Sequence, residues 1–202
     1  ISDEKEGREK LYRVLANQSS TGSFGLWGPG YGDLWLDAFV TDFLTRAREQ
    51  KFDVPEQAML QALSNLQNAI SYDVNVGTQG NEIAYALYVL ARNRKAAISD
   101  LRYYADTKLS EFTSPLARAH LAGALGLYGD AQRSMTIFAN ALGLSRDSIL
   151  NASLSRTDYG SSLRDGAAIL ALAAEARPVP DIIPELTKIV AKQWESKRWT
   201  ST

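Results

Sequence analysis

LARAHLAGALGLY, residues 116–128, is apolar on nearly every side of a helical wheel, and this stretch decides how the chain folds. IAYALYVLA (83–91) and GAAILALAAEA (166–176) have the same character. A helix without a polar face must be surrounded by other protein. These segments therefore predict an inner layer of helices that is covered by a second layer.

The segments between them carry a single apolar stripe, which is typical of helices at a surface. In 55–72, for example, Met59, Leu63 and Leu66 recur at helical spacing while Asn65 points away. The two kinds of helix alternate along the chain. We expect outer helices over 4–18, 55–72, 97–109, 130–142 and 181–195, and inner helices over 34–50, 82–93, 115–128 and 162–176.

Helix start signals agree with this alternation, because Asp33, Ser114 and the capping box 53–56 fall where helices are expected to begin. No segment shows a convincing strand pattern. The sequence thus predicts one all-α domain over residues 1–202. Its expected form is an α/α toroid, two concentric layers of antiparallel helices, incomplete because the chain is a fragment. A helical-repeat solenoid is the main competitor, although its repeats are usually more regular.

The loop GSFGLWGPGYGDLW, residues 22–35, joins closely spaced glycines to Trp27, Tyr31 and Trp35. If the inner helices run parallel, their N-termini share one end, where exposed amides suit anions or polarised carbonyls. This loop arrives at that end together with 75–82, 111–115 and 156–165. We therefore expect it to cover the mouth of the toroid, with Trp35 in the core.

Composition excludes several classes of function. The chain has 22 basic and 23 acidic residues without a long run of one sign, which argues against nucleic acid or anionic lipid as a partner. No apolar run approaches the roughly 20 residues that span a bilayer. There is no cysteine, and no acidic or histidine-rich cluster typical of a metal site. We expect no membrane insertion, metal or cofactor.

Residues 22–58 resemble the thioester domain of bacterial alpha-macroglobulins. In that family a GSF-type turn precedes an inner helix of the pattern W-L-x-A-Y-V-x-D-F-L, which residues 35–44 match with Phe39 in place of tyrosine. Segments 82–92, 100–109 and 158–176 are also similar to the family. The similarity runs over almost the whole chain, so we expect residues 1–202 to be the C-terminal portion of such a domain.

The resemblance implies a scaffold in a large, periplasmic or cell-envelope inhibitor that traps proteases broadly. In that family, cleavage by a protease exposes a cysteine–glutamine thioester, which then acylates the protease. The expected partners are therefore other domains of the parent protein and, in the full-length protein, target proteases. The thioester motif lies upstream of the segment seen here, and this chain has no cysteine. The implied role is a scaffold and not an enzyme.

On this resemblance, we predict that Trp27, Tyr31, Asp33 and Tyr159 lie at the end that faces the thioester. The aromatic side chains would shield the bond from water, or they would simply seal the end of the toroid. Trp194 and Trp199 are expected far from this cluster.

Complement relatives place a histidine just after the glycine-rich turn, but residues 26–34 contain none. His120, the only histidine, lies in an inner segment. We interpret it as a core residue and not as a general base.

Two other classes of function stay open. Some α/α toroids are carbohydrate-active enzymes that use carboxylates at inner-helix N-termini. The candidates here are Asp33, Asp37, Glu82, Asp158 and Asp165. We expect structural roles for them, such as helix caps or an ion pair between Arg164 and Asp165. A plain protein-interaction scaffold is the third reading.

Overall fold

The computed structural model describes residues 2–71, 75–150 and 161–196, and this part of the chain is helical apart from its loops and one isolated β-bridge between Gln18 and Phe24. The all-α prediction is confirmed. The α-helices are α1 (Ser2–Leu15), α2 (Leu34–Glu49), α3 (Glu56–Ser71), α4 (Val76–Arg92), α5 (Ile98–Thr107), α6 (Pro115–Leu127), α7 (Ala131–Leu150), α8 (Ser162–Glu175) and α9 (Ile183–Ser196), with a 3₁₀ turn, η1, over Leu109–Glu111.

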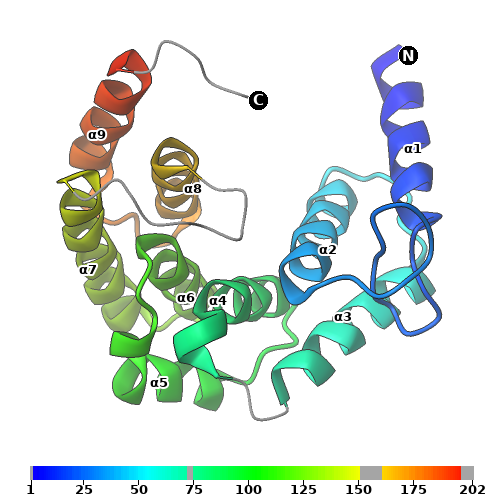
Figure 1. Cartoon of the computed structure of the whole chain (residues 1–202), viewed down its shortest axis with the longest axis horizontal. Coiled ribbons are helices and arrows are strands. Elements are labelled where there is room, and N and C mark those ends of the chain that lie inside the picture. The colour runs from blue at the N-terminus through cyan, green and yellow to red at the C-terminus, as the bar shows by residue number, and fades with distance from the viewer. Residues whose placement is uncertain (1, 72–74, 151–160, 197–202) are drawn as a thin grey trace.

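The helices form two layers that bend into an open arc (Figure 1). The inner layer is the series α2, α4, α6 and α8, in which each helix packs against the next. The outer layer contains α3, α5, α7 and α9, which pack on the backs of the inner helices. The two ends of the arc are formed by α1 and α9.

Helices α4 and α6 form the centre of the core. Within 83–91 and 117–125 almost every residue is buried, as their apolar composition predicts. Many of these residues are alanines, which let neighbouring inner helices approach closely. Outer helices contribute larger side chains from one face only, such as Leu66 of α3, Leu101 of α5 and Phe138 of α7. The alternation of the two helix types along the sequence therefore corresponds to the two layers.

The four inner helices run in the same direction. Their last residues, Glu49, Arg92, Leu127 and Glu175, line one pocket of about 560 Å³. The C-terminal ends of α2, α4, α6 and α8 thus share one end of the arc, and their N-terminal ends share the other. We call these the C-terminal end and the N-terminal end of the inner layer.

Three helix boundaries differ from the sequence prediction by three residues or more. Helix α1 ends at Leu15 because the backbone of Asn17 turns to accept a bond from Gly25. Helix α4 begins at Val76, and a non-helical residue, Gln79, interrupts its first turns. Helix α7 continues to Leu150, beyond the end expected from its apolar stripe.

The buried face of helix α2 is largely polar. The interpretation of Trp35 as a core residue was wrong, because Trp35 is only half-buried and stacks on Phe39 with 5.2 Å between ring centroids. Phe39 and Phe43, one and two turns further along, are exposed. The buried side of α2 carries Asp37, Ala38, Thr41, Asp42, Leu44 and Thr45.

Candidate functional site

The glycine-rich loop lies at the N-terminal end of α2, on the arm of the arc that α1, α2 and α3 form (Figure 1). Its first residue packs on α3, since a Cβ atom on Gly22 would lie 2.1 Å from the carbonyl oxygen of Gln61. Just before the loop, Gln18 Nε2 donates to the carbonyl oxygen of Ala58 at 2.8 Å. Phe24 is fully buried beneath it. The expectation that the loop covers the mouth of the toroid is not met in this chain, because the loop lies beside this arm and not across the concave side.

A single carboxylate holds the base of the loop. Asp37 lies one turn inside α2, and its oxygens accept hydrogen bonds from Ser23 Oγ at 2.9 and 3.0 Å and from the amide of Phe24 at 2.8 Å. The side chain of Asn65, on α3, donates to the same carboxylate at 2.7 Å. Ser23 Oγ in turn accepts from the amide of Gly32 at 2.8 Å. We call these five residues the loop anchor.

Close backbone approach fixes the shape of the loop within this anchor. A Cβ atom on Gly25 would lie 2.2 Å from the carbonyl oxygen of Gly28, and one on Gly32 would lie 2.3 Å from that of Phe24. No side chain fits at these distances, so the two positions require glycine. The glycines therefore make the loop compact.

The tip of the loop is an apolar projection into solvent. Trp27 is 98% exposed and Tyr31 is 85% exposed. Leu26, which precedes Trp27 in the sequence, is also exposed. In this chain the aromatic side chains do not seal the end of the arc. A large apolar surface held on a compact loop is a typical feature of a protein-protein contact.

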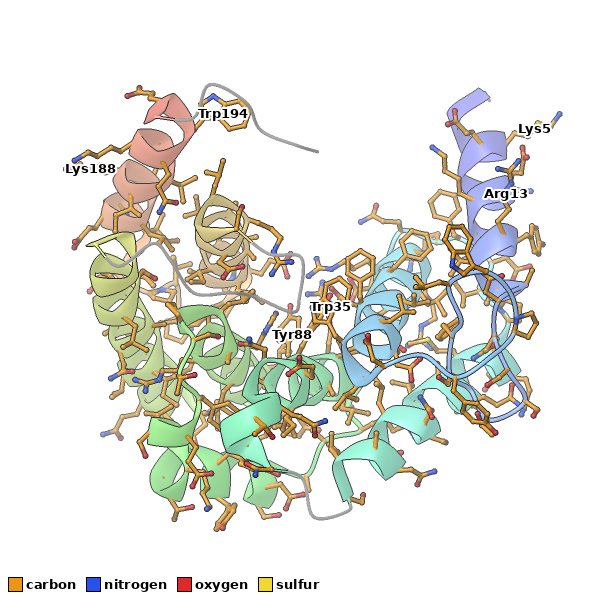
Figure 2. All side chains as sticks on the ribbon, in the orientation of Figure 1. Lys5, Arg13, Trp35, Tyr88, Lys188 and Trp194 are labelled. Atoms are coloured by element: carbon orange, nitrogen blue, oxygen red, sulfur yellow. The ribbon has the colours of Figure 1, made fainter. Side chains whose placement is uncertain are left out.

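The other predicted site residues lie in different situations. Asp33 is the N-cap of α2 and accepts from the amide of Leu36 at 2.7 Å, as its position in the sequence predicts. Tyr159 and Trp199 lie outside the described residues. Trp194 is on α9, at the far arm of the arc from the glycine-rich loop (Figure 2).

The carboxylates proposed for an enzyme do not form a catalytic set. Asp33 caps a helix, Asp37 belongs to the loop anchor, and Asp165 pairs with Arg164 at 3.0 Å, as predicted for that pair. Asp158 lies outside the described residues, and Glu82 is half-buried in α4. Among the residues that the structure describes, no group of three or more acidic or histidine side chains lies close enough to hold a metal ion.

The C-terminal end of the inner layer carries a second polar cluster, which we call the ion network: Asp42, Arg46, Glu49, Arg92 and Glu175. Glu175 of α8 pairs with Arg46 of α2 at 2.9 Å and with Arg92 of α4 at 2.6 Å. Arg92 also pairs with Glu49 at 2.7 Å, and Arg46 with Asp42 at 3.1 Å. The network thus joins three inner helices that are far apart in sequence.

The ion network changes the acidity of its members. Burial alone would raise the pKa of Glu175, but hydrogen bonds from Arg46 and Arg92 lower it overall. The pKa of Glu49 is lowered by its hydrogen bonds with Arg92. Both carboxylates are therefore ionised at neutral pH. Because arginines near helix C-termini also interact favourably with the helix dipoles, the network stabilises this end of the arc.

His120 lies in the core, as its position in an inner helix predicts. Its ring stacks on Tyr85, with 4.5 Å between centroids, and contacts Tyr88 at a tilt. Burial lowers the pKa of His120 to about 3, so the ring is neutral at physiological pH. Its Nδ1 is buried without a hydrogen-bond partner. The ring lies among aromatic side chains with its Nδ1 buried, and this geometry gives no support to a general base.

Sequence reasoning missed the loop anchor and the ion network. The sequence carries a signal for a polar buried face on α2, because Asp37, Thr41 and Thr45 recur every four residues and so lie on one side of the helix, but this pattern does not indicate Ser23 or Asn65 as partners of Asp37. We expected Trp35 to lie in the core, but it is half-buried and, like Tyr88, lies on the concave side of the arc (Figure 2). The ion network joins residues up to 129 positions apart, and no local pattern indicates such a contact.

A two-layered helical arc with parallel inner helices and an aromatic loop at their N-terminal end is an α/α-toroid architecture. The chain is 36% identical to alpha-2-macroglobulin from Escherichia coli strain K12, over 95% of the chain and 12% of that protein. It is homologous over most of its length to bacterial alpha-2-macroglobulin, which confirms the family resemblance seen in the sequence. No protein-family model matches the chain.

Solved structures agree with this relationship. Native E. coli alpha-2-macroglobulin spanning domain MG7 to the C-terminus matches 98% of this chain with a TM-score of 0.82 and 34% identity, over 32% of its own length. The E. coli protein activated by porcine elastase matches 96% with a TM-score of 0.81 and 33% identity, over 18% of its length. Salmonella alpha-2-macroglobulin reacted with methylamine matches 94% with a TM-score of 0.79 and 34% identity, over 13%.

The chain therefore corresponds to a small part of much longer proteins, within the region from domain MG7 to the C-terminus. Over the part of the chain that the structure describes, no helix combines the length and the apolar character needed to cross a membrane.

Proposed function

We propose that this chain is a scaffold portion of the thioester domain in an alpha-2-macroglobulin that traps proteases. The observation that carries the proposal is the match of nearly the whole chain to E. coli alpha-2-macroglobulin in a form activated by elastase. The match to a Salmonella relative reacted with methylamine adds support, since a small amine is the expected reactant of a thioester. The chain itself has no cysteine, so its own role is structural.

In this proposal the thioester joins a cysteine and a glutamine elsewhere in the full-length protein. An amine of the captured protease attacks the acyl carbon, an amide bond forms, and the cysteine leaves as a thiol. Before capture, water must be kept from the bond. The uncharged loop tip, with Trp27 and Tyr31, lies at the N-terminal end of the inner layer, and we propose that it covers the thioester segment there, beside Asp33.

The test compares two proteins. One is a full-length alpha-2-macroglobulin that carries this sequence, and the control is the isolated chain of residues 1–202. The full-length protein should inhibit elastase cleavage of a large protein substrate stoichiometrically, and prior treatment with methylamine should abolish this inhibition. The chain alone should leave the cleavage rate unchanged. Full inhibition by the methylamine-treated protein, or inhibition by the chain alone, would contradict the proposal.

Shielding by the loop has its own test. In the full-length protein, Tyr31→Ala should increase the spontaneous release of the thioester thiol, because the substitution opens the bond to water. Met135→Ala, which also removes an exposed side chain but lies on α7, is the matched control. A thiol release rate that is the same in both variants would show that the loop does not shield the bond.

We place the full-length protein in the periplasm or cell envelope, as a proposal that follows from the family relationship. Its partners there would be the other domains of the same polypeptide and the proteases it captures. Cell fractionation of an organism that carries the gene, with an antibody to this segment, is the test. Recovery of the protein only from the cytoplasmic fraction would contradict the placement.

A further inference from the structure

The loop anchor brings both ends of the glycine-rich loop to one carboxylate. Phe24 at the start of the loop donates its amide directly to Asp37, at 2.8 Å. Gly32 at the end of the loop reaches Asp37 through Ser23, whose hydroxyl accepts from Gly32 and donates to the carboxylate. Between these two ends, residues 25–31 have a single hydrogen bond that involves a side chain. In it, Asn17 Nδ2 donates to the carbonyl oxygen of Leu26 at 3.5 Å, which is longer than the bonds of the anchor.

The same carboxylate connects the loop to the outer layer. Asn65 of α3 donates to the oxygen of Asp37 that also accepts from Ser23, at 2.7 Å. All these donors are neutral groups, and Asp37 is 5% exposed. A buried carboxylate held by neutral donors is costly to desolvate, and it is stabilised only while those donors keep their places. Burial accordingly raises the pKa of Asp37, against the lowering effect of the Phe24, Ser23 and Asn65 bonds.

The position of the loop tip depends on this arrangement. Leu26, Trp27 and Tyr31 lie between the two anchored ends and are exposed, so few contacts within the chain hold their side chains in place. The anchor and the close backbone approaches at Gly25 and Gly32 are what give them a defined location. Groups held in place before contact lose less entropy on binding.

We propose that Asp37 is the positioning residue of the glycine-rich loop: its carboxylate holds the loop ends together and so sets where Trp27 and Tyr31 lie. The positioning itself stands on the structure of this chain. Its consequence for the thioester, namely that loss of Asp37 exposes the bond to water, rests on the proposed function.

The first experiment measures amide hydrogen exchange in the chain of residues 1–202. In Asp37→Asn, the amides of Phe24 and Gly32 should exchange roughly tenfold faster or more relative to the amides of Leu87 and Val89 in α4. The NH₂ group of an asparagine at position 37 is itself a donor, so it would face the donors of the anchor. The side chain therefore cannot accept the hydrogen bonds of Ser23, Phe24 and Asn65 together. Asp42→Asn, which alters another buried carboxylate on the same helix, should leave the Phe24 and Gly32 rates unchanged relative to α4.

A milder variant separates the two arms of the anchor. Ser23→Ala removes the acceptor of the Gly32 amide but leaves that of Phe24, so Gly32 alone should exchange faster. Equal exchange of Phe24 and Gly32 in wild type and Asp37→Asn, after normalisation to α4, would overturn the proposal. If Asp37→Asn does not fold, Ser23→Ala decides: an unchanged Gly32 rate overturns the proposal.

The second experiment measures thiol release from the full-length protein. Asp37→Asn should release the thioester thiol roughly tenfold faster than wild type, and Asp42→Asn should not, if the loop shields the bond. Faster loop exchange in the chain without faster thiol release in the full-length protein would leave the positioning role intact and show that the shielding function is wrong. Failure of the positioning proposal and failure of the proposed function are thereby distinguishable.

Discussion

The two ends of the inner helix layer are held by polar clusters of different chemistry. At the N-terminal end, the loop anchor uses one buried carboxylate and neutral donors. At the C-terminal end, the ion network uses two arginines and three carboxylates, and Arg46 and Glu175 are partly open to solvent. A buried network of neutral donors has strict geometry, whereas partly exposed ion pairs tolerate movement and are screened by salt. The anchor therefore positions a loop, and the network holds helices together.

The largest expected effect is the loss of the anchoring carboxylate. Asp37→Ala leaves the Phe24 amide, the Ser23 hydroxyl and the Asn65 amide group without their acceptor in a buried site. We expect the free energy of unfolding to fall by about 3 kcal/mol, measured by urea denaturation at pH 7. Asp33→Ala, which removes only the exposed cap of the same helix, should cost about 1 kcal/mol. Equal losses in the two variants would contradict the special role of Asp37.

The ion network should contribute less. Arg92→Met breaks the pairs with Glu49 and Glu175, and we expect a loss of about 1 to 2 kcal/mol, since solvent weakens these pairs. High salt should reduce this loss, whereas the loss from Asp37→Ala should be independent of salt. Urea denaturation of both variants at low and high sodium chloride is the measurement. A loss from Arg92→Met that salt does not change would remove the electrostatic distinction between the two ends.

Acidification should change the stability that the two ends contribute in opposite directions. The folded-state pKa values of Glu49 and Glu175 lie below their ordinary value of 4.5, so the stability they contribute is present above that pH and lost as the pH falls through the folded pKa. The pKa of Asp37 is raised above 3.8, so its contribution is present below 3.8 and lost as the pH rises through the folded pKa.

Urea denaturation at pH 7 and pH 4 separates these contributions. The deficit of Glu175→Gln relative to wild type should shrink on acidification, because wild type loses the ionised carboxylate that the variant lacks. The deficit of Asp37→Asn should grow, because protonation removes the cost of the buried charge from wild type alone. Deficits that change in the same direction would contradict the assignment of opposite shifts.

The smallest effect should come from the loop tip. Trp27→Ala and Tyr31→Ala should each change the free energy of unfolding by less than about 0.5 kcal/mol, because both side chains are exposed. Phe24→Ala, in the same loop but in the core, should cost about 3 kcal/mol. Thermal denaturation of the three variants tests this. A tip substitution as costly as Phe24→Ala would mean that the tip packs against the fold.

The sequence predicted the helices and their two layers because apolar periodicity reports burial directly, as in 83–91 and 116–128. It also predicted the caps at Asp33 and Ser114, since capping depends on residues a few positions apart. It failed for Trp35, which looks like a core residue but is half-buried and stacks on the exposed ring of Phe39. Only the fold brings Ser23 and Asn65 to Asp37, so hydrophobic pattern did not reveal the anchor.

The solvent exposure of Trp27 in two settings tests most directly whether the glycine-rich loop covers the thioester. Hydroxyl-radical footprinting of the chain alone should modify Trp27 at nearly the rate of free tryptophan, as its 98% exposure requires. In the native full-length protein, we expect the thioester segment to protect Trp27 and methylamine treatment to make it reactive again. Trp194 should show no such dependence on methylamine. Equal modification of Trp27 in the chain and in both states of the full-length protein would contradict the claim that this loop covers the thioester.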